Sequence, residues 1–385
     1  MQLSIIILNY NVRYFLETCI LSVQKAIENL DAEIIVVDNN SSDESCRMMK
    51  NRFPNVKLIE NQENTGFPKG NNIGVKQAKG EYICILNPDT IVAEDTFVKL
   101  LTESSQLSAG IIGCKLIDGK GNFLPESKRG IPTPWVSFTK IFGLYKVFPK
   151  SKLFNQYYAQ HLSENQSGNV DILVGAFMVM KRELYNEIGG FDENCFMYSD
   201  DIDLSYMALK LGKENYYFHE TTVIHFKGES TVKDETYMKR FQEAMNFFYK
   251  KHFRVSILFS FFMKIGIVFF SFFKMFQGKP NPISKPENYI LISDSNDLKL
   301  KVEKKIQKNL VISNANNINE IFSQFISKTG TTEIIFDINH INFKDSISFI
   351  QNNNHKKVTF KLLPPNSNFI IGSNSSNDRG EIIYF

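Results

Sequence analysis

Short apolar runs rich in isoleucine and valine alternate with polar segments in the first part of the chain. Residues 3–8 and 33–37 form two such runs, and Leu16, Ile20 and Val23 recur between them at helical spacing. This pattern predicts a β-α-β unit. Because strands that alternate with helices build mostly parallel sheets covered by helices, we expect an α/β fold.

The alternation continues well beyond this first unit. The hydrophobic pattern predicts further strands at residues 56–59, 82–86, 110–116 and 170–180, and helices at residues 46–50, 95–105, 181–188 and 205–211. Residues 64–74 contain three glycines and are predicted to form a loop before a short helix. Such glycines permit positive φ and a close approach of the backbone to a ligand, although the dinucleotide and phosphate-loop patterns are not matched.

The last hundred residues have the pattern of a second, smaller α/β unit. Three prolines between residues 279 and 286 indicate a linker before it. The first strand of this unit runs into Ser293-Asp294-Ser295-Asn296-Asp297 without the glycines that hold a pyrophosphate, which favours a structural or regulatory role over a cofactor site. Its predicted strands are residues 289–292, 310–312, 333–336 and 358–362.

Phenylalanine changes this picture, because many of its 34 residues crowd into positions 247–276. Between residues 255 and 273 the single charge is Lys264, so this run approaches the length that crosses a bilayer. From residue 233 to residue 285 there are ten basic and three acidic residues, a net charge of +7 that favours an anionic cytoplasmic leaflet. We expect residues 236–286 to be a helical, membrane-associating segment; a buried helix between domains is the alternative.

The charge and the cysteines limit the function classes. A formal net charge of +3 over 385 residues argues against nucleic acid as a partner. Five cysteines, an odd number without C-x-x-C spacing, indicate free thiols in a reducing compartment. Residues 3–8 are strand-length rather than a signal peptide. These features predict a cytoplasmic protein with three parts, residues 1–235, 236–286 and 287–385.

Two carboxylates follow predicted strands. Asp89 stands in Asn87-Pro88-Asp89-Thr90, directly after the strand at residues 82–86, and Asp38 ends the second strand. Pro88 cannot donate to a sheet ladder and therefore ends its strand. Open α/β sheets bind ligands at the carboxyl ends of their strands, so Asp89 is suited to hold a metal-bound phosphate and Asp38 a nucleoside.

A second acidic group lies farther along the chain. Asp200, Asp201 and Asp203 repel one another, but the first turn of a helix favours their charge. An acidic helix start without a function is the alternative for these residues, and the apolar run at residues 191–198 before them weakens it. His225, in the strand-like run Val223-Ile224-His225-Phe226, would by itself be read as a core histidine. Together with Asp89, however, His225 would give a divalent cation a carboxylate and an imidazole. Asp200 or Asp201 could then take the proton of an attacking hydroxyl.

These motifs, in this order, resemble those of family 2 glycosyltransferases, especially the rhamnosyltransferase-like branch. The resemblance covers about residues 1–235 and implies a GT-A fold, a nucleotide-sugar donor, Mg²⁺ or Mn²⁺, and inversion at the anomeric carbon. The tail, in turn, looks like the Rossmann-like domain of some bacterial polysaccharide sugar transferases. The motifs that carry the family resemblance are Ile6-Ile7-Leu8-Asn9-Tyr10-Asn11, Val36 to Asp43, Asn64-Thr65-Gly66-Phe67, Gly70 to Gly74, Asn87-Pro88-Asp89-Thr90, Gly189 to Glu193, Asp200 to Leu204 and His225.

The resemblance also implies roles for single residues. Asp201 matches the catalytic base, Asp89 the metal-binding acid of the Asp-x-Asp position, and His225 a metal ligand of related members. Two departures are Asn87 in place of the first acid of Asp-x-Asp, and Asp200 in place of a glutamate beside the base. The residues expected to bind the donor are Asn9, Asn11, Asp38, Asn40, Asn64, Gly66, Phe67, Asn71 and Asn87.

The sequence thus predicts an inverting, metal-dependent hexosyltransferase, with rhamnose as one candidate sugar. It would extend a glycan or lipid-linked acceptor in bacterial surface polysaccharide synthesis, peripheral or monotopic at the inner face of the cell membrane. A nucleotidyltransferase is one alternative, but residues 9–13 lack a basic, glycine-rich triphosphate loop. A silent nucleotide-sugar-binding subunit is the other, and the joint presence of Asp89, Asp201 and His225 argues against it.

Overall fold

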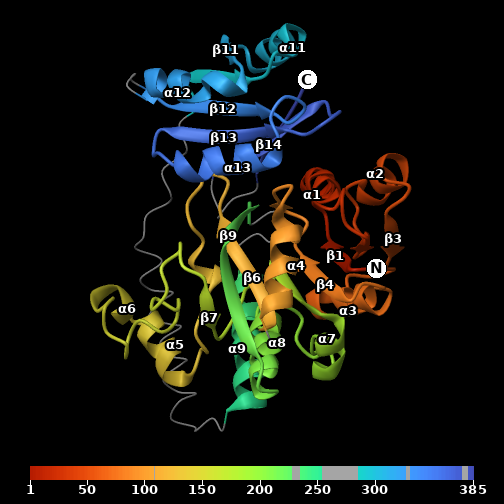
Figure 1. The fold of residues 1–385 in the computed structure, drawn as a ribbon, viewed down its shortest axis with the longest axis vertical. Coiled ribbons are helices and arrows are strands. Elements are labelled where there is room, and N and C mark those ends of the chain that lie inside the picture. Colours follow the sequence, from red (N-terminus) through yellow and green to blue (C-terminus); the bar gives the residue numbers. More distant parts are fainter. Residues whose placement is uncertain (108, 228–234, 254–284, 327–329, 375–379) are drawn as a thin grey trace.

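The computed structural model describes residues 1–107, 109–227, 235–253, 285–326, 330–374 and 380–385. Two α/β units lie against each other, a larger one built on a nine-stranded sheet and a smaller one on a six-stranded sheet (Figure 1). The expected α/β fold with a second, smaller α/β unit is confirmed. The boundaries predicted for its three parts stay predictions.

The large sheet is parallel on one side and mixed on the other. Its order is β3-β2-β1-β4-β8-β6-β9-β5, with β7 also paired to β9. The first four strands are parallel, whereas β8 is antiparallel to both β4 and β6. The strands are β1 (Leu3–Asn9), β2 (Ala32–Asp38), β3 (Lys57–Glu60), β4 (Tyr82–Leu86), β5 (Thr90–Ile91), β6 (Ala109–Ile117), β7 (Gly168–Val170), β8 (Phe177–Lys181) and β9 (Glu214–His225).

Helices cover this sheet because each carries an apolar stripe. Leu16, Cys19, Ile20 and Val23 of α1, for example, are buried in the same core cluster as β1 and β2. The helices of the larger unit are α1 (Arg13–Ala26), α2 (Ser45–Arg52), α3 (Gly66–Lys76), α4 (Thr96–Gln106), α5 (Pro134–Ile141), α6 (Leu144–Val147), α7 (Arg182–Ile188), α8 (Asp200–Lys210) and α9 (Glu235–His252).

The prediction of a glycine-rich loop over residues 64–74 is wrong, because helix α3 begins at Gly66 and includes the rest of this segment. Two of these glycines allow close packing of the helix rather than backbone flexibility. A Cβ on Gly70 would lie 2.4 Å from Leu8 Cδ1, and one on Gly74 would lie 2.6 Å from Ile6 Cγ2. The helix can therefore rest directly on β1, and this gain outweighs the low helix propensity of glycine.

The prediction of one continuous strand over residues 170–180 is also wrong. The segment divides into β7 and β8, and residues 171–176 between them leave the ladder. The backbone of Ile172 pairs there with Arg129, and Gly175 N donates to Asp201. This interruption brings residues 174–176 into the cavity described below.

The smaller unit has the sheet order β11-β10-β12-β13-β14-β15, in which β11, β10, β12 and β13 are parallel. The four predicted strands are present, and the pattern missed β14 and β15, which add antiparallel to the edge. The elements are β10 (Asn288–Ile292), α11 (Asn296–Ile306), β11 (Leu310–Ser313), α12 (Ile318–Ile326), β12 (Thr332–Asp337), α13 (Phe343–Asn352), β13 (Val358–Leu363), β14 (Phe369–Gly372) and β15 (Glu381–Tyr384).

The two units share a hydrophobic cluster. Helix α13 packs against β9, and both carboxylate oxygens of Glu94 accept hydrogen bonds from the N-terminal amides of this helix, at 2.8 Å from Phe343 and from Lys344. The shared cluster joins Phe15, Ile91, Ile224 and Phe226 of the larger unit to Phe343, Ile347 and Ile350 of α13.

Among the described residues, no helix is both long and apolar enough to cross a membrane. The membrane-associating segment was predicted over residues 236–286. Its first part is helix α9, and residues 254–284, which include the phenylalanine-rich run, lie outside the described residues.

Candidate active site

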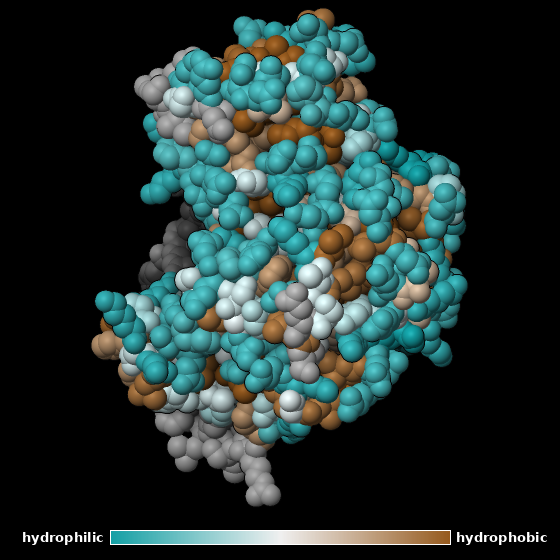
Figure 2. Space-filling view, in the orientation of Figure 1, coloured by the Kyte–Doolittle hydropathy of each residue, from teal (hydrophilic) through white to brown (hydrophobic). Residues whose placement is uncertain are grey.

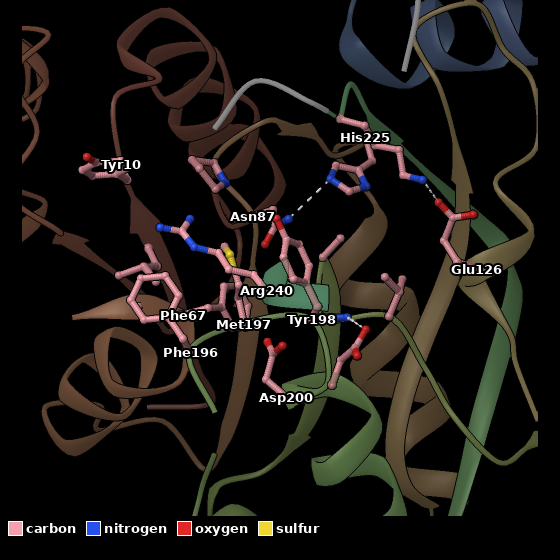
Figure 3. A pocket seen from close by; sticks show the side chains of 18 of the residues that line it. Tyr10, Phe67, Asn87, Glu126, Phe196, Met197, Tyr198, Asp200, His225 and Arg240 are labelled. Atoms are coloured by element: carbon pink, nitrogen blue, oxygen red, sulfur yellow. Dashed lines mark hydrogen bonds and ion pairs between the residues drawn. The ribbon is translucent and has the colours of Figure 1, made fainter. Parts of the chain in front are cut away.

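A cavity of about 520 Å³ lies at the carboxyl ends of β1 and β4, at the size typical of small-ligand sites. Asp200 rises into it from α8, while Asn87 and His225 lie on the opposite side, with Tyr198 between them (Figure 3). Its described lining is Leu8, Tyr10, Asn39, Asn64, Gly66, Phe67, Asn87, Pro88, Glu126, Arg129, Lys140, Tyr157, Tyr158, Val174, Gly175, Ala176, Phe196, Met197, Tyr198, Asp200, Asp201, His225, Lys227 and Arg240.

One side of the cavity rests on a network at the ends of β1 and β2. The register of these parallel strands pairs Asn9 with Asp38, and Asn9 Nδ2 donates to Asp38 Oδ2 at 2.7 Å. The other Asp38 oxygen accepts from Ser41 N at 2.7 Å. Asp38 is 1% exposed, so in this structure it fixes the turn after β2 rather than facing the cavity.

Asn39 is the residue of that turn that lines the cavity. Its Nδ2 donates to Gly66 O at 3.1 Å, and its Oδ1 accepts from Asn61 and Thr65. Gly66 has φ +79°, and a Cβ there would lie 2.8 Å from the Phe196 ring. Glycine therefore permits both the backbone turn and the contact with Phe196 that closes this side of the cavity.

The candidate metal ligands lie together at the opposite side. Asp89 Oδ1 is 3.4 Å from His225 Nε2, because Thr90 of β5 pairs with His225 at the end of β9. Asn87 Nδ2 lies 3.3 Å from the same imidazole nitrogen. His225 lines the cavity, whereas Asp89, 4% exposed, is buried and is not among the lining residues.

The residues at this point fit a divalent cation. His225 Nδ1 is buried and has no hydrogen-bond partner among the described residues. A buried nitrogen without a partner loses the hydrogen bonds that water would give it, so a ligand at Nδ1 is favourable. Asp89 and Asn87 lie beside the other ring nitrogen, Nε2, which is the one that could share a cation with Asp89. A carboxylate beside an imidazole is a donor set that suits Mn²⁺ or Mg²⁺ when phosphate and water complete the shell.

The two adjacent acids of α8 have different surroundings. Asp201 Oδ2 accepts from Arg129 Nη2 at 2.6 Å and from Gly175 N at 3.0 Å, so this carboxylate is held as half of a buried ion pair. Asp200 forms no ion pair with a described residue. Burial and the neighbouring charge of Asp201 raise the pKa of Asp200 to about 8, although the charge of Arg129 partly offsets the rise. At neutral pH Asp200 is therefore mainly protonated.

The third acid of this turn serves the structure instead. Asp203 accepts from Lys251 at 2.8 Å and from His252 at 2.5 Å, and both partners stand at the end of α9. These contacts fasten α9 to α8. Arg240 on the same helix then lies over the Phe196 ring, 4.9 Å from its centroid, at the mouth of the cavity.

A further part of the cavity lining is basic and aromatic. Lys140 Nζ lies 3.5 Å from the centroid of the Tyr157 ring. Burial raises the pKa of Tyr157, but the cations Lys140 and Arg129 outweigh burial and the net shift is downward. Burial lowers the pKa of Lys140. This wall would favour an anionic ligand.

The cavity gathers several of the residues singled out in the sequence. Among the predicted donor-binding residues, Asn64, Gly66, Phe67 and Asn87 line it. Asn9, Asp38 and Asn71 are buried in supporting contacts, while Asn11 and Asn40 lie at positive φ beside the turn that follows β2. Of the predicted catalytic and metal-binding residues, Asp200, Asp201 and His225 line the cavity.

Sequence reasoning missed the wall formed by Arg129, Lys140, Tyr157 and Tyr158. These residues come from a stretch in which only the abundance of proline and aromatic residues was noticeable. Nothing in a linear pattern pairs Arg129 with Asp201, 72 positions later. The lack of acidic residues from 127 to 163 was the available signal.

Comparison with known proteins adds an independent result. Residues 4–189 match the model of the family described as Glycosyl transferase family 2. The N-acetylglucosaminyl-diphospho-decaprenol L-rhamnosyltransferase of Mycobacterium tuberculosis is 25% identical over 244 residues, which cover 60% of this chain and 78% of that protein. The low-salt glycan biosynthesis hexosyltransferase Agl10 of Haloferax volcanii is 26% identical over 250 residues, covering 64% of this chain and 73% of that protein.

A solved structure with similarity is that of a mannosyltransferase of Pyrobaculum calidifontis in complex with GDP-Man and Mn²⁺. It is 19% identical, has a TM-score of 0.45, and the match covers 66% of this chain and 65% of that one.

Proposed function

Residues 4–189 match the model of family 2 glycosyltransferases, and from this premise we propose that the chain is a metal-dependent, inverting hexosyltransferase with a nucleotide-sugar donor. Its acceptor would be a growing glycan or a lipid-linked saccharide at the inner face of the membrane, in the synthesis of a bacterial surface polysaccharide. The relative named as a diphospho-decaprenol L-rhamnosyltransferase supports a lipid-linked acceptor and makes rhamnose one candidate sugar.

One observation carries the proposal. The cavity unites Asn87 and His225, which adjoin Asp89, with the acids Asp200 and Asp201, although these residues come from separate parts of the chain. A nucleotide sugar bound across the ends of β1 and β4 would place its diphosphate near Asn87 and His225 and its sugar toward α8. This orientation agrees with ligand binding at the carboxyl ends of strands in α/β sheets.

Donor binding would divide between direct and supporting residues. Asn64, Gly66, Phe67 and Asn87 would contact the donor, since they line the cavity. Asn9, Asp38 and Asn71 would hold the elements that carry the lining residues, and Asn11 and Asn40 would border the nucleoside.

Asp89 and His225 would hold a Mg²⁺ or Mn²⁺ ion. When bound, such an ion neutralises the negative charge that develops on a departing nucleoside diphosphate. Asn87 Nδ2 lies 3.3 Å from the same Nε2 that faces Asp89, so this amide would release its contact when the nitrogen binds the ion. With asparagine in place of a first acid, Asp89 is the main carboxylate at this point.

Asp201 would act as general base. It takes the proton of the acceptor hydroxyl while the oxygen forms a bond to the anomeric carbon and the bond from that carbon to the diphosphate breaks. Arg129 and Gly175 N hold one of its carboxylate oxygens and so fix the direction of the group. Because Asp200 is mainly protonated at neutral pH, it would donate a hydrogen bond rather than compete for the proton.

The test is release of nucleoside diphosphate from a panel of nucleotide sugars with lipid-linked and soluble acceptors, with and without a chelator. We expect turnover that requires a divalent cation. Asp89→Ala and Asp201→Asn should each lower it by at least about 100-fold, the scale of losing one electrostatic or proton-transfer contribution.

Asp31→Ala is a matched control, because this aspartate is 66% exposed and pairs with the N-terminus at 2.9 Å, remote from the cavity. Full turnover by Asp201→Asn would reject the assigned base. Donor binding without turnover in the unmodified protein would reject the enzyme and favour a silent binding subunit.

A further inference from the structure

Helices α5 and α6 and the residues that follow them expose a cluster of large apolar side chains. Figure 1 places α5 and α6 at an outer edge of the larger unit, and Figure 2 shows apolar and polar atoms mixed there. Five of the thirteen exposed large hydrophobic side chains in the described part of the chain fall within residues 134–154. They are Trp135 (43%), Phe142 (38%), Val147 (67%), Phe148 (48%) and Leu153 (54%).

These side chains form one continuous surface, which we term the aromatic patch. The Trp135 ring lies 5.6 Å from that of Phe138 and 5.9 Å from that of Phe154, which in turn lies 5.3 Å from Phe148. Trp135 Nε1 donates to Leu153 O at 3.0 Å, so α5 is tied to the segment after α6. The patch consists of Trp135, Phe138, Phe142, Val147, Phe148, Leu153 and Phe154.

Cations accompany the patch and acids do not. Between residues 127 and 163 the chain has six lysine and arginine residues and neither aspartate nor glutamate. Lys146, Lys150 and Lys152 of this set are exposed among the apolar side chains. Exposed apolar surface ringed by one sign of charge is typical of an interaction site rather than of ordinary solvent-facing surface.

The same segment reaches the cavity. Lys140, near the end of α5, lines the cavity together with Tyr157 and Tyr158, while Trp135 near the start of the helix faces outward. A molecule with an apolar tail on the patch could thus present its polar end to the acids of α8. A patch with this placement suits an acceptor that is fixed in a membrane.

We propose that the aromatic patch docks on an anionic phospholipid surface and so presents the cavity to a lipid-linked acceptor; the second half of this inference rests on the proposed function. Tryptophan and phenylalanine insert at the boundary between headgroups and acyl chains, and nearby lysines pair with anionic headgroups. Pairing of two copies through this face is disfavoured, because a two-fold contact would bring the exposed lysines of both copies together.

The chain carries its own reporter, since Trp135 is its single tryptophan. The full protein is mixed with vesicles of phosphatidylcholine alone or with phosphatidylglycerol, and the tryptophan emission is recorded with ordinary or brominated acyl chains. We expect a blue shift and quenching by the brominated lipids that grow with the phosphatidylglycerol content and weaken with salt. This signal is local, so binding through any other part of the chain does not mimic it.

The variant Val147→Asp/Phe148→Asp/Leu153→Asp should need at least about tenfold more lipid to reach half of the Trp135 signal. The matched control is Val98→Asp/Leu300→Asp/Val311→Asp, three other exposed apolar residues elsewhere, which should keep the signal. Circular dichroism verifies that both fold. Transfer to a water-soluble acceptor should be the same in the two variants, because none of these six residues lines the cavity.

Three results would overturn the proposal. These are no vesicle binding, vesicle binding without a change at Trp135, and the same blue shift produced by raising the protein concentration without vesicles, which would assign the patch to a second copy. Absence of nucleoside diphosphate release with a normal Trp135 response would instead reject the proposed function and leave the membrane contact standing.

Discussion

Asp200 and Asp201 are neighbours in sequence, yet their surroundings differ. Arg129 pairs with Asp201, whereas burial and the charge of Asp201 raise the pKa of Asp200 to about 8. A spacing pattern shows that acids are adjacent but not which one a distant arginine reaches. The sequence therefore left the base open between the two, and the placement of Arg129 supports Asp201.

The raised pKa makes stability depend on pH. In the unfolded chain Asp200 loses its proton near its ordinary value, while in the folded protein it keeps the proton until about pH 8. Between about pH 4 and pH 8 the folded state thus binds more protons than the unfolded state. The free energy of unfolding therefore falls as the pH rises through this window. Above about pH 8 the loss is complete.

We expect Asp200→Asn to remove this dependence. Relative to the unmodified protein, the variant should gain stability with rising pH, with a slope of up to about 1.4 kcal/mol per pH unit between pH 4 and 8. Urea unfolding at pH 5, 6.5 and 8 measures it, with Asp31→Asn as the exposed control. Parallel stability profiles for the variant and the unmodified protein would show that Asp200 is ionised in the folded state.

At the scale of elements, the contact between α3 and β1 is set by the lack of side chains. Gly70 and Gly74 lie four residues apart on one face of the helix, against Leu8 and Ile6. Three glycines in nine residues predicted a loop because glycine disfavours helices in isolation. Packing against β1 reverses this preference, and no local rule contains that information.

Gly70→Ala should therefore destabilise the protein, by about 1–3 kcal/mol, although alanine is the better helix former. The new Cβ would lie 2.4 Å from Leu8 Cδ1, so α3 or the Leu8 side chain must shift. Lys76→Ala in the same helix is exposed and should change the free energy of unfolding by less than about 0.5 kcal/mol. A stabilising Gly70→Ala in chemical denaturation would mean that α3 does not press on β1 as described.

At the scale of the whole molecule, the smaller unit is part of the hydrophobic core beside the site. Ile224 and Phe226, which flank His225, share a cluster with residues of α13. The sequence predicted a separate unit after a linker. What it did not indicate is that this unit covers the end of the strand that carries a candidate metal ligand.

We expect Ile347→Asp to lower the stability of both units together, by about 3 kcal/mol or more, because it places a charge in their shared cluster. Calorimetry should show one transition at a lower temperature, and turnover should be lost at that same temperature. Ser348→Asp, exposed on the same helix, should behave like the unmodified protein. A split transition, with turnover retained after the first step, would show that the units are independent.

The sequence by itself determined the alternation of strands and helices, the positions of Asp38 and Asp89 at the ends of their strands, and the resemblance to a family, because these are local patterns or fixed motifs. The tertiary structure decided which residues meet. The pairing of Thr90 with His225 brings Asp89 to the imidazole, and the break between β7 and β8 lets Arg129 reach Asp201. These contacts join positions up to 136 residues apart, and their energy depends on burial and distance, which only the folded chain defines.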